Sequence, residues 1–167
     1  FPNTYKISKN FTIANMTGGE PFLIQKQLPG NAFGKARILT VAQTVENMAY
    51  LAENVLEVIY GIYGPAAMTS RGGGKPGGVW QINSGLRLNG SPTSEHNEGM
   101  AVDLRPANNK SQDTFDMAKN LVSALKFNNF LLEYRSPPAT AGWQRWIHIS
   151  YRVTGNTTHY ATYLNDK

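Results

Sequence analysis

The strongest structural signal in the sequence is a run of apolar residues that recur at three- and four-residue spacing after Ile38. Residues with this spacing lie on one face of an α-helix, because an α-helix turns once every 3.6 residues. The pattern therefore predicts a long amphipathic helix that ends near Gly61 or Gly64. The apolar positions of this helix are Val41, Val45, Met48, Leu51, Ala52, Val55, Leu56 and Ile59.

Shorter segments with strand character follow this helix, and a second helix opens at Ser111. The predicted strands are 66–70, 79–83, 100–104, 130–133 and 146–151. The glycine-rich segment 71–78 lacks the residue order of a phosphate-binding loop, so it is interpreted as a substrate-side loop or a plain linker. The order of helix, strands, helix and strands predicts an α+β fold with a small antiparallel sheet and flanking helices.

The length and composition of the chain suit one globular domain over residues 1–167. A hydrophobic share of 41% and a charged share of 16% are typical of a chain with a packed core. Residues 1–36 are interrupted by glycine and proline, and we expect them to form an N-terminal arm packed on the core. No stretch approaches the roughly 20 apolar residues that a membrane helix needs, so membrane insertion is not expected.

Charge and cysteine content narrow the functional classes. The formal net charge of +5 favours anionic partners, among them the bacterial cell wall. Nucleic acid is not an expected partner, because the sequence has no run of Lys or Arg and no basic cluster interleaved with aromatic residues. The chain has no cysteine, which excludes disulfides and thiolate metal sites. Any metal ion must therefore bind to His, Asp and Glu.

Two of the three histidines lie where they can meet an aspartate. Asp103 and His148 belong to predicted strands, and the alternation of side chains lets both project toward one point. His96 lies in the turn before the first of these strands, and Gly99 would let the backbone bring its imidazole to the same point. Two imidazoles and a carboxylate with an open fourth position form a catalytic zinc site. Taken singly, each residue is more often an ordinary core or turn residue. His159 has no partner motif, and we expect it to be an ordinary surface or satisfied histidine.

The motif around these residues resembles a known signature. The pattern Ser-x-His-x-x-Gly-x-Ala-x-Asp followed by Trp-x-His resembles that of the D-alanyl-D-alanine carboxypeptidase and dipeptidase family of zinc peptidases. Its positions are filled by Ser94, His96, Gly99, Ala101, Asp103, Trp146 and His148. The segments 10–13, 55–59 and 130–133 are similar to the branch of this family often found in bacteriophage genomes. The resemblance implies a fold like that of the Hedgehog signalling domain and the DD-peptidases, with Zn²⁺ bound by His96, Asp103 and His148.

The same resemblance implies an activity and a setting. It predicts a zinc metallopeptidase, an endopeptidase or a carboxypeptidase, that hydrolyses stem or crosslink peptides of bacterial peptidoglycan. It would be a phage endolysin or a lytic domain on a virion, with tail or baseplate proteins as further partners. It would act at the cell wall, outside the cytoplasm. The alternative is a non-catalytic virion structural or wall-binding module that keeps the peptidase fold.

The catalytic acid/base residue that the resemblance implies is not at the usual position in this chain. Family members commonly have an acidic residue three positions before the last histidine, where this chain has Arg145. Phage-type relatives carry a Glu at the end of the preceding strand, and Glu133 fits that position. The other interpretation of Glu133 is an ordinary surface residue of a strand. Glu95 and Glu98 flank His96 and are fallback candidates, although we expect both to face solvent.

Four further residues are candidates for substrate binding. A guanidinium is the side-chain group best suited to bind a stem-peptide carboxylate, and relatives use an arginine shortly after the first strand. Arg71 follows the predicted strand directly and is preferred, while Arg87 in Ser-Gly-Leu-Arg remains an open alternative. Ser94 is expected to support His96 through a hydrogen bond or to be a turn hydroxyl. Trp146 is expected to line the groove or to fill the core.

Overall fold

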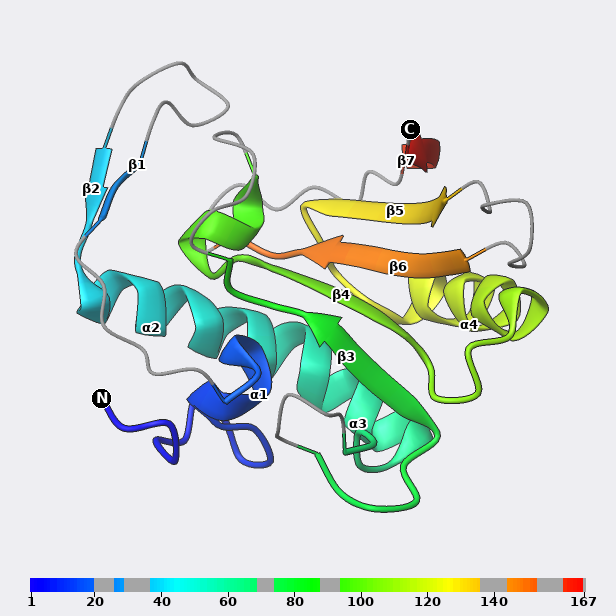
Figure 1. Ribbon diagram of the computed structural model, residues 1–167, viewed down its shortest axis with the longest axis horizontal. Coiled ribbons are helices and arrows are strands. Elements are labelled where there is room, and N and C mark those ends of the chain that lie inside the picture. Colours follow the sequence, from blue (N-terminus) through cyan, green and yellow to red (C-terminus); the bar gives the residue numbers. More distant parts are fainter. Residues whose placement is uncertain are drawn as a thin grey trace.

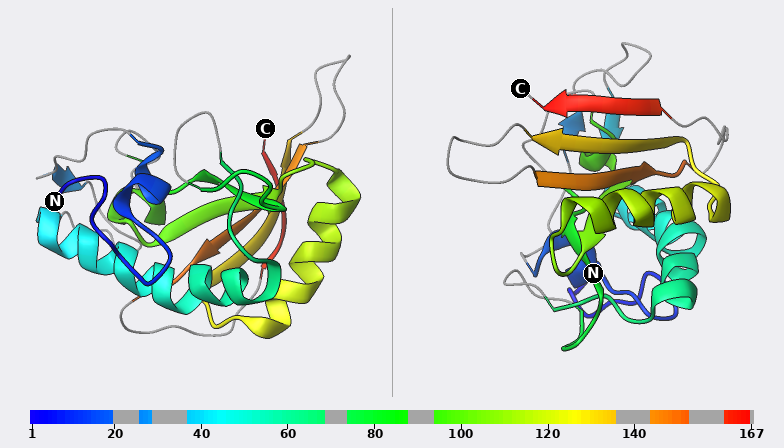
Figure 2. Two further views of the ribbon diagram at one scale, coloured as in Figure 1. Left: turned by 90° about the horizontal axis from the view of Figure 1, so that it is seen from below. Right: turned by 90° about the vertical axis from the view of Figure 1, so that its right-hand side faces the viewer.

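A five-stranded sheet forms the centre of the computed structural model, with helices packed on one of its faces (Figures 1 and 2). The structure describes residues 1–19, 26–28, 37–68, 74–87, 94–135, 144–152 and 161–166. The strands are β3 (Trp80–Ser84), β4 (Ala101–Pro106), β5 (Asn129–Arg135), β6 (Gln144–Ser150) and β7 (Ala161–Asp166). Their order across the sheet is β3-β4-β6-β5-β7.

The α+β class predicted from the sequence is confirmed, and the sheet is antiparallel except at one edge. β3, β4, β6 and β5 pair antiparallel with their neighbours, whereas β7 pairs parallel with β5. β7 lies on the side of β5 that faces away from β6, and it runs in the same direction as β5. The sequence pattern did not single out this last strand.

The long helix is present and begins later than its periodicity predicts. It consists of α2 (Val41–Leu51), the π-helical segment η1 (Ala52–Leu56) and α3 (Glu57–Tyr63). Thr40 caps it, because its side chain accepts a hydrogen bond from the backbone of Gln43 while the Gln43 side chain accepts one from the backbone of Thr40. Ile38 lies instead in a two-stranded sheet made of β1 (Lys26–Leu28) and β2 (Arg37–Leu39).

The strand predicted over 66–70 is not formed in its described part. Ala67 makes only an isolated bridge with Lys75. The described end of the glycine-rich segment, Gly74–Gly78, lies against the backbone of Ala66 and Ala67, where a Cβ on Gly74 or Gly78 would collide. This contact is at the Trp80 end of β3, since the Ala67 N–H donates to the Trp80 carbonyl. The described part of the glycine-rich segment is therefore a packed turn at that end of the strand.

The core lies between the sheet and the helices. α4 (Ser111–Ala124) packs against β4, β5 and β6. One face of the strands is apolar and belongs to the same buried cluster as the inner face of the long helix. The residues of β4, β5 and β6 on this face are Val102, Leu104, Phe130, Leu132, Ile147 and Ile149. The alternating residues of β4 and β6 point to the opposite face.

The first nineteen residues contribute to this core. α1 (Ile13–Thr17) and the chain before it bury four apolar side chains in the cluster: Ile7, Phe11, Ile13 and Met16. A polar contact fixes the same segment to α3. The Glu57 carboxylate accepts hydrogen bonds from the Ser8 hydroxyl at 2.7 Å and from the backbone and side-chain nitrogens of Asn10 at 2.6 and 2.7 Å.

Replacing Glu57 with Gln should make the protein less stable near neutral pH, by about 1–2 kcal/mol, because part of this half-exposed hydrogen-bond set is lost. Burial raises the pKa of Glu57, but the hydrogen bonds from Ser8 and Asn10 outweigh it and hold the pKa below the ordinary value of 4.5. The contribution of Glu57 is thus complete above pH 4.5 and is lost as the pH falls through the folded-state value.

Urea unfolding at a series of pH values measures this difference. The gap between wild type and Glu57→Gln should close on acidification, whereas exposed Glu53, when changed to Gln, should show no such gap. A gap that stays constant down to the acid limit would contradict the role of the charged carboxylate.

Candidate metal centre

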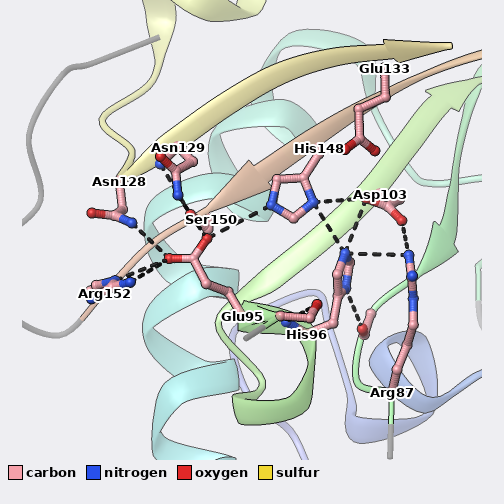
Figure 3. Close-up of polar contacts among 12 residues, drawn as sticks. Arg87, Glu95, His96, Asp103, Asn128, Asn129, Glu133, His148, Ser150 and Arg152 are labelled. Atoms are coloured by element: carbon pink, nitrogen blue, oxygen red, sulfur yellow. Dashed lines mark hydrogen bonds and ion pairs between the residues drawn. The ribbon is translucent and has the colours of Figure 1, made fainter. Parts of the chain in front are cut away.

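Three buried side chains from three elements meet on the face of the sheet opposite the core. Asp103 lies in β4 and His148 in β6, and the two are directly paired across these strands. His96 comes from the 3-10 helix η2 (Glu95–Glu98), which leads into β4. The exposed fractions of His96, Asp103 and His148 are 2%, 4% and 9%. The predicted convergence of the three residues is present in the structure (Figure 3).

A tight turn brings His96 to this point. The Ser94 side chain accepts a hydrogen bond from the His96 backbone N–H at 3.3 Å, which caps η2. Gly99 ends η2 with a φ of 74°, a left-handed conformation that favours glycine. A Cβ on Gly99 would also lie only 2.9 Å from Met48 Cγ and 3.0 Å from the Thr44 carbonyl oxygen. The turn is therefore packed against α2, and Ser94 supports the backbone of His96 and not its ring.

The distances among the three donor atoms suit a single metal ion. His96 Nε2 lies 3.2 Å from His148 Nδ1 and 3.2 Å from Asp103 Oδ1, and His148 Nδ1 lies 3.1 Å from the same oxygen. Ligands about 2.0–2.1 Å from a tetrahedral ion are separated from one another by about 3.3 Å. The buried group of His96, Asp103 and His148 could thus hold a metal ion.

The His96 ring is oriented by a backbone carbonyl. Its Nδ1 lies 2.7 Å from the carbonyl oxygen of Gly85. A carbonyl only accepts hydrogen bonds, so Nδ1 carries the proton and Nε2 keeps its lone pair toward Asp103 and His148. Gly85 follows β3 directly, and a Cβ there would lie 2.5 Å from the Met16 carbonyl oxygen. The role of Gly85 could not be anticipated from the sequence, because the contact is made through the main chain.

Asp103 and His148 form a buried ion pair. Burial lowers the pKa of His148, but hydrogen bonds with Asp103 and Glu95 raise it to about 9. Burial raises the pKa of Asp103, but hydrogen bonds and charges of His148 and His96 have the larger, opposite effect. The pKa of Asp103 therefore lies well below its usual range. Because metal ligands must be deprotonated, an ion binding here must displace the proton from His148 Nδ1.

Arg87 reaches the same point from the segment after β3. Its Nη2 contacts Asp103 Oδ2 and lies 3.4 Å from His96 Nε2, while its Nε donates to Ser84 Oγ at 2.6 Å. The Arg87 side chain is 41% exposed, so part of the guanidinium can face a bound molecule. Arg71, the other residue predicted to bind a substrate carboxylate, lies outside the described residues, as does His159.

Glu133 lies on the same face of the sheet, on β5. Its neighbour across the strands is Trp146, whose indole Nε1 donates a hydrogen bond to Glu133 Oε2. Figure 3 shows the Glu133 carboxylate directed toward His148 and Asp103. Burial raises the pKa of Glu133, and the charges of His148 and Asp103 also act on it. Half-buried Trp146 therefore holds Glu133 in place. A contact between Trp146 and a substrate stays a prediction.

Arg145 belongs to the other face of β6, since it alternates with Trp146 and His148. An acidic residue at that position of this strand would point away from the three donor atoms. The departure from the family pattern at Arg145 thus removes no group from this site.

The expectation that Glu95 and Glu98 face solvent is wrong. The Glu95 side chain is 12% exposed and its Oε2 lies 3.8 Å from His148 Nε2. Glu98 is 9% exposed, and its backbone carbonyl accepts a hydrogen bond from the Asn47 side chain at 2.9 Å. Glu98 is buried and Glu95 is largely covered, because η2 packs against the long helix, a non-local packing that the local sequence does not reveal.

No protein-family model matches the chain, and no curated protein is significantly similar to it. Among the described residues, none of the helices has the length and apolar character needed to cross a bilayer.

Proposed function

We propose that the protein is a zinc-dependent peptidase that hydrolyses peptide bonds of bacterial peptidoglycan. The observation that carries this proposal is the set of three buried donor atoms 3.1–3.2 Å apart, with a carboxylate of raised pKa on the same face of the sheet. The zinc-peptidase signature around His96, Asp103 and His148 supports the same activity.

Zinc suits this donor set better than the other common metal ions. Mg²⁺ and Ca²⁺ prefer oxygen ligands, whereas two imidazoles and one carboxylate are typical of catalytic zinc. Zinc bound by His96, Asp103 and His148 would supply the Lewis acidity that makes water nucleophilic near neutral pH and polarises the carbonyl to be attacked. Three protein ligands would leave room for that water, as a catalytic site requires.

Glu133 supplies the proton transfers in this proposal. Its carboxylate accepts the proton of the attacking water and passes it to the nitrogen of the leaving amine. The burial that raises the pKa of Glu133 brings it nearer to the working pH, which favours both steps. The hydrogen bond from Trp146 fixes one carboxylate oxygen, and the other oxygen is left for the proton.

Arg87 supplies positive charge beside the reacting carbonyl. Its half-exposed guanidinium can stabilise the developing oxyanion or bind a carboxylate of the stem peptide, because a guanidinium offers several donors in one plane. In the first role Arg87 affects chiefly kcat, and in the second chiefly KM.

The biological setting follows from the substrate. We propose a phage endolysin or a lytic domain on a virion, acting at the bacterial cell wall, with stem or crosslink peptides as substrate and tail or baseplate proteins as further partners. The net charge of +5 would hold such an enzyme near an anionic wall.

Mass spectrometry of purified peptidoglycan after digestion tests the proposal. The zinc-loaded protein should release new amino groups at one kind of peptide bond, and a chelator should stop the release. Walls of several crosslink chemistries identify the bond. Stoichiometric zinc binding with no cleavage of any wall would contradict the peptidase and favour the non-catalytic wall-binding or virion module.

A further inference from the structure

The carboxylate of Glu95 lies at the centre of a hydrogen-bond cluster behind the metal centre (Figure 3). Its Oε1 accepts from Asn128 Nδ2 at 2.7 Å and from Arg152 at 3.0–3.1 Å. Its Oε2 accepts from Asn129 Nδ2 at 3.0 Å, and the Ser150 hydroxyl adds another hydrogen bond. These partners come from the start of β5 and the end of β6, so the carboxylate joins η2 to both strands.

This cluster fixes the Glu95 carboxylate in place. Donors from Asn128, Asn129 and Arg152 occupy both of its oxygens, and the Arg152 guanidinium compensates its negative charge. A carboxylate with this many donors has few other orientations open to it. Glu95 therefore presents a fixed negative charge to whatever lies on its inner side.

The residue on that side is His148, and its two ring nitrogens have different neighbours. Nδ1 faces the donor group, 3.1 Å from Asp103 Oδ1 and 3.2 Å from His96 Nε2. Nε2 faces away from that group, 3.8 Å from Glu95 Oε2, which is the separation of an ion pair. When the proton on Nδ1 is displaced by an ion, a negative charge beside Nε2 holds the remaining proton on Nε2.

We propose that Glu95 is a positioning residue of the metal centre, which keeps the proton of His148 on Nε2 and so leaves the Nδ1 lone pair for the ion. The same carboxylate limits rotation of the imidazole and increases the electron density that Nδ1 donates. The inference rests on the metal centre of the proposed function and not on the bond that is cut.

A catalytic role does not suit Glu95. Its two oxygens are already taken by Asn128, Asn129 and Arg152, and the His148 ring lies between Glu95 and Asp103 (Figure 3). A proton acceptor for the attacking water must instead be within hydrogen-bond reach of that water. Glu95 thus acts through His148.

Zinc affinity of Glu95→Ala and Glu95→Gln tests this inference. Competition with a chromophoric chelator near neutral pH gives the Kd of each folded protein. We expect zinc binding about 10–100-fold weaker in Glu95→Ala, the usual effect of losing such an outer partner. Glu95→Gln should lose less, because its amide oxygen can still accept from Nε2–H. The absorption spectrum of the cobalt-substituted variants should change in the same order.

Circular dichroism and thermal unfolding of the metal-free variants separate this role from a purely structural one. Variants that are less stable but bind zinc as tightly as wild type would overturn the inference. The exposed Glu53→Gln is the matched control and should keep the wild-type Kd. Wild type that binds no zinc would contradict the metal centre as well as the role of Glu95. Wild type that binds zinc but cuts no wall contradicts only the peptidase, and the affinities still decide the role of Glu95.

Discussion

Replacement of His148 by Ala should abolish stoichiometric zinc binding and lower peptidoglycan hydrolysis by on the order of 10³-fold or more. His148 Nδ1 is one of only three donor atoms in the described cluster, and its loss leaves His96 and Asp103 to hold the ion alone. Without the ion there is no activated water for Glu133 to deprotonate, so the contribution of the general base, about 10²–10⁴-fold, is lost together with the activation of the water.

The fold should tolerate this substitution. Asp103 would lose its partner His148 but keep the ion pair with Arg87, so its buried charge stays compensated. Metal content by elemental analysis and amine release from peptidoglycan give the two readouts, with circular dichroism to show that the variant is folded. Asp116→Ala, a change at an exposed carboxylate of α4, is the control and should behave like wild type. Full activity of folded His148→Ala after chelation would rule out the zinc mechanism.

Replacement of Glu133 by Gln should lower kcat about 10²–10⁴-fold while zinc content stays at one ion per chain. Glutamine has the shape of glutamate, and its amide oxygen can still accept the hydrogen bond from Trp146 Nε1. What it cannot do is take a proton from the attacking water. The change therefore separates the proton transfer from the metal and from the packing of β5 on β6.

Kinetics of wall digestion by the zinc-loaded variant measure this effect. Glu53→Gln carries the same chemical change at an exposed position of η1 and should keep wild-type kcat. If Glu133→Gln has wild-type kcat, the proton acceptor is another group and Glu133 is a partner of Trp146 only. If it loses zinc as well as activity, Glu133 is part of the metal centre itself.

The parts of the fold that could be predicted from the sequence are those that depend on local periodicity. The apolar spacing of the long helix and the alternation in β4 and β6 are set by the geometry of each element alone. Alternation also placed Asp103 and His148 on one face, and the structure pairs them directly. Glycine at position 99 indicated the turn that brings His96 to them, because few other residues adopt its φ of 74°.

The parts that could not be predicted depend on contacts between distant segments. Ile38 continues the apolar pattern of the helix, but pairing with Gln27 places it in a strand. Glu95 looked like a solvent-facing neighbour of a ligand, because its partners Asn128 and Arg152 lie more than thirty residues further along the chain. Gly85 has no side chain whose chemistry could have marked it as a partner of His96.

The main-chain contacts around Gly85 couple the first helix to the metal centre. The Leu86 N–H donates to the Met16 carbonyl at 2.8 Å, and the neighbouring Gly85 carbonyl holds the His96 ring at 2.7 Å. Opening of α1 away from the sheet would therefore disturb the His96 ring, and an ion that holds His96 would oppose that opening. Affinity for the ion can thus be altered from the far side of β3, through a helix that supplies no ligand.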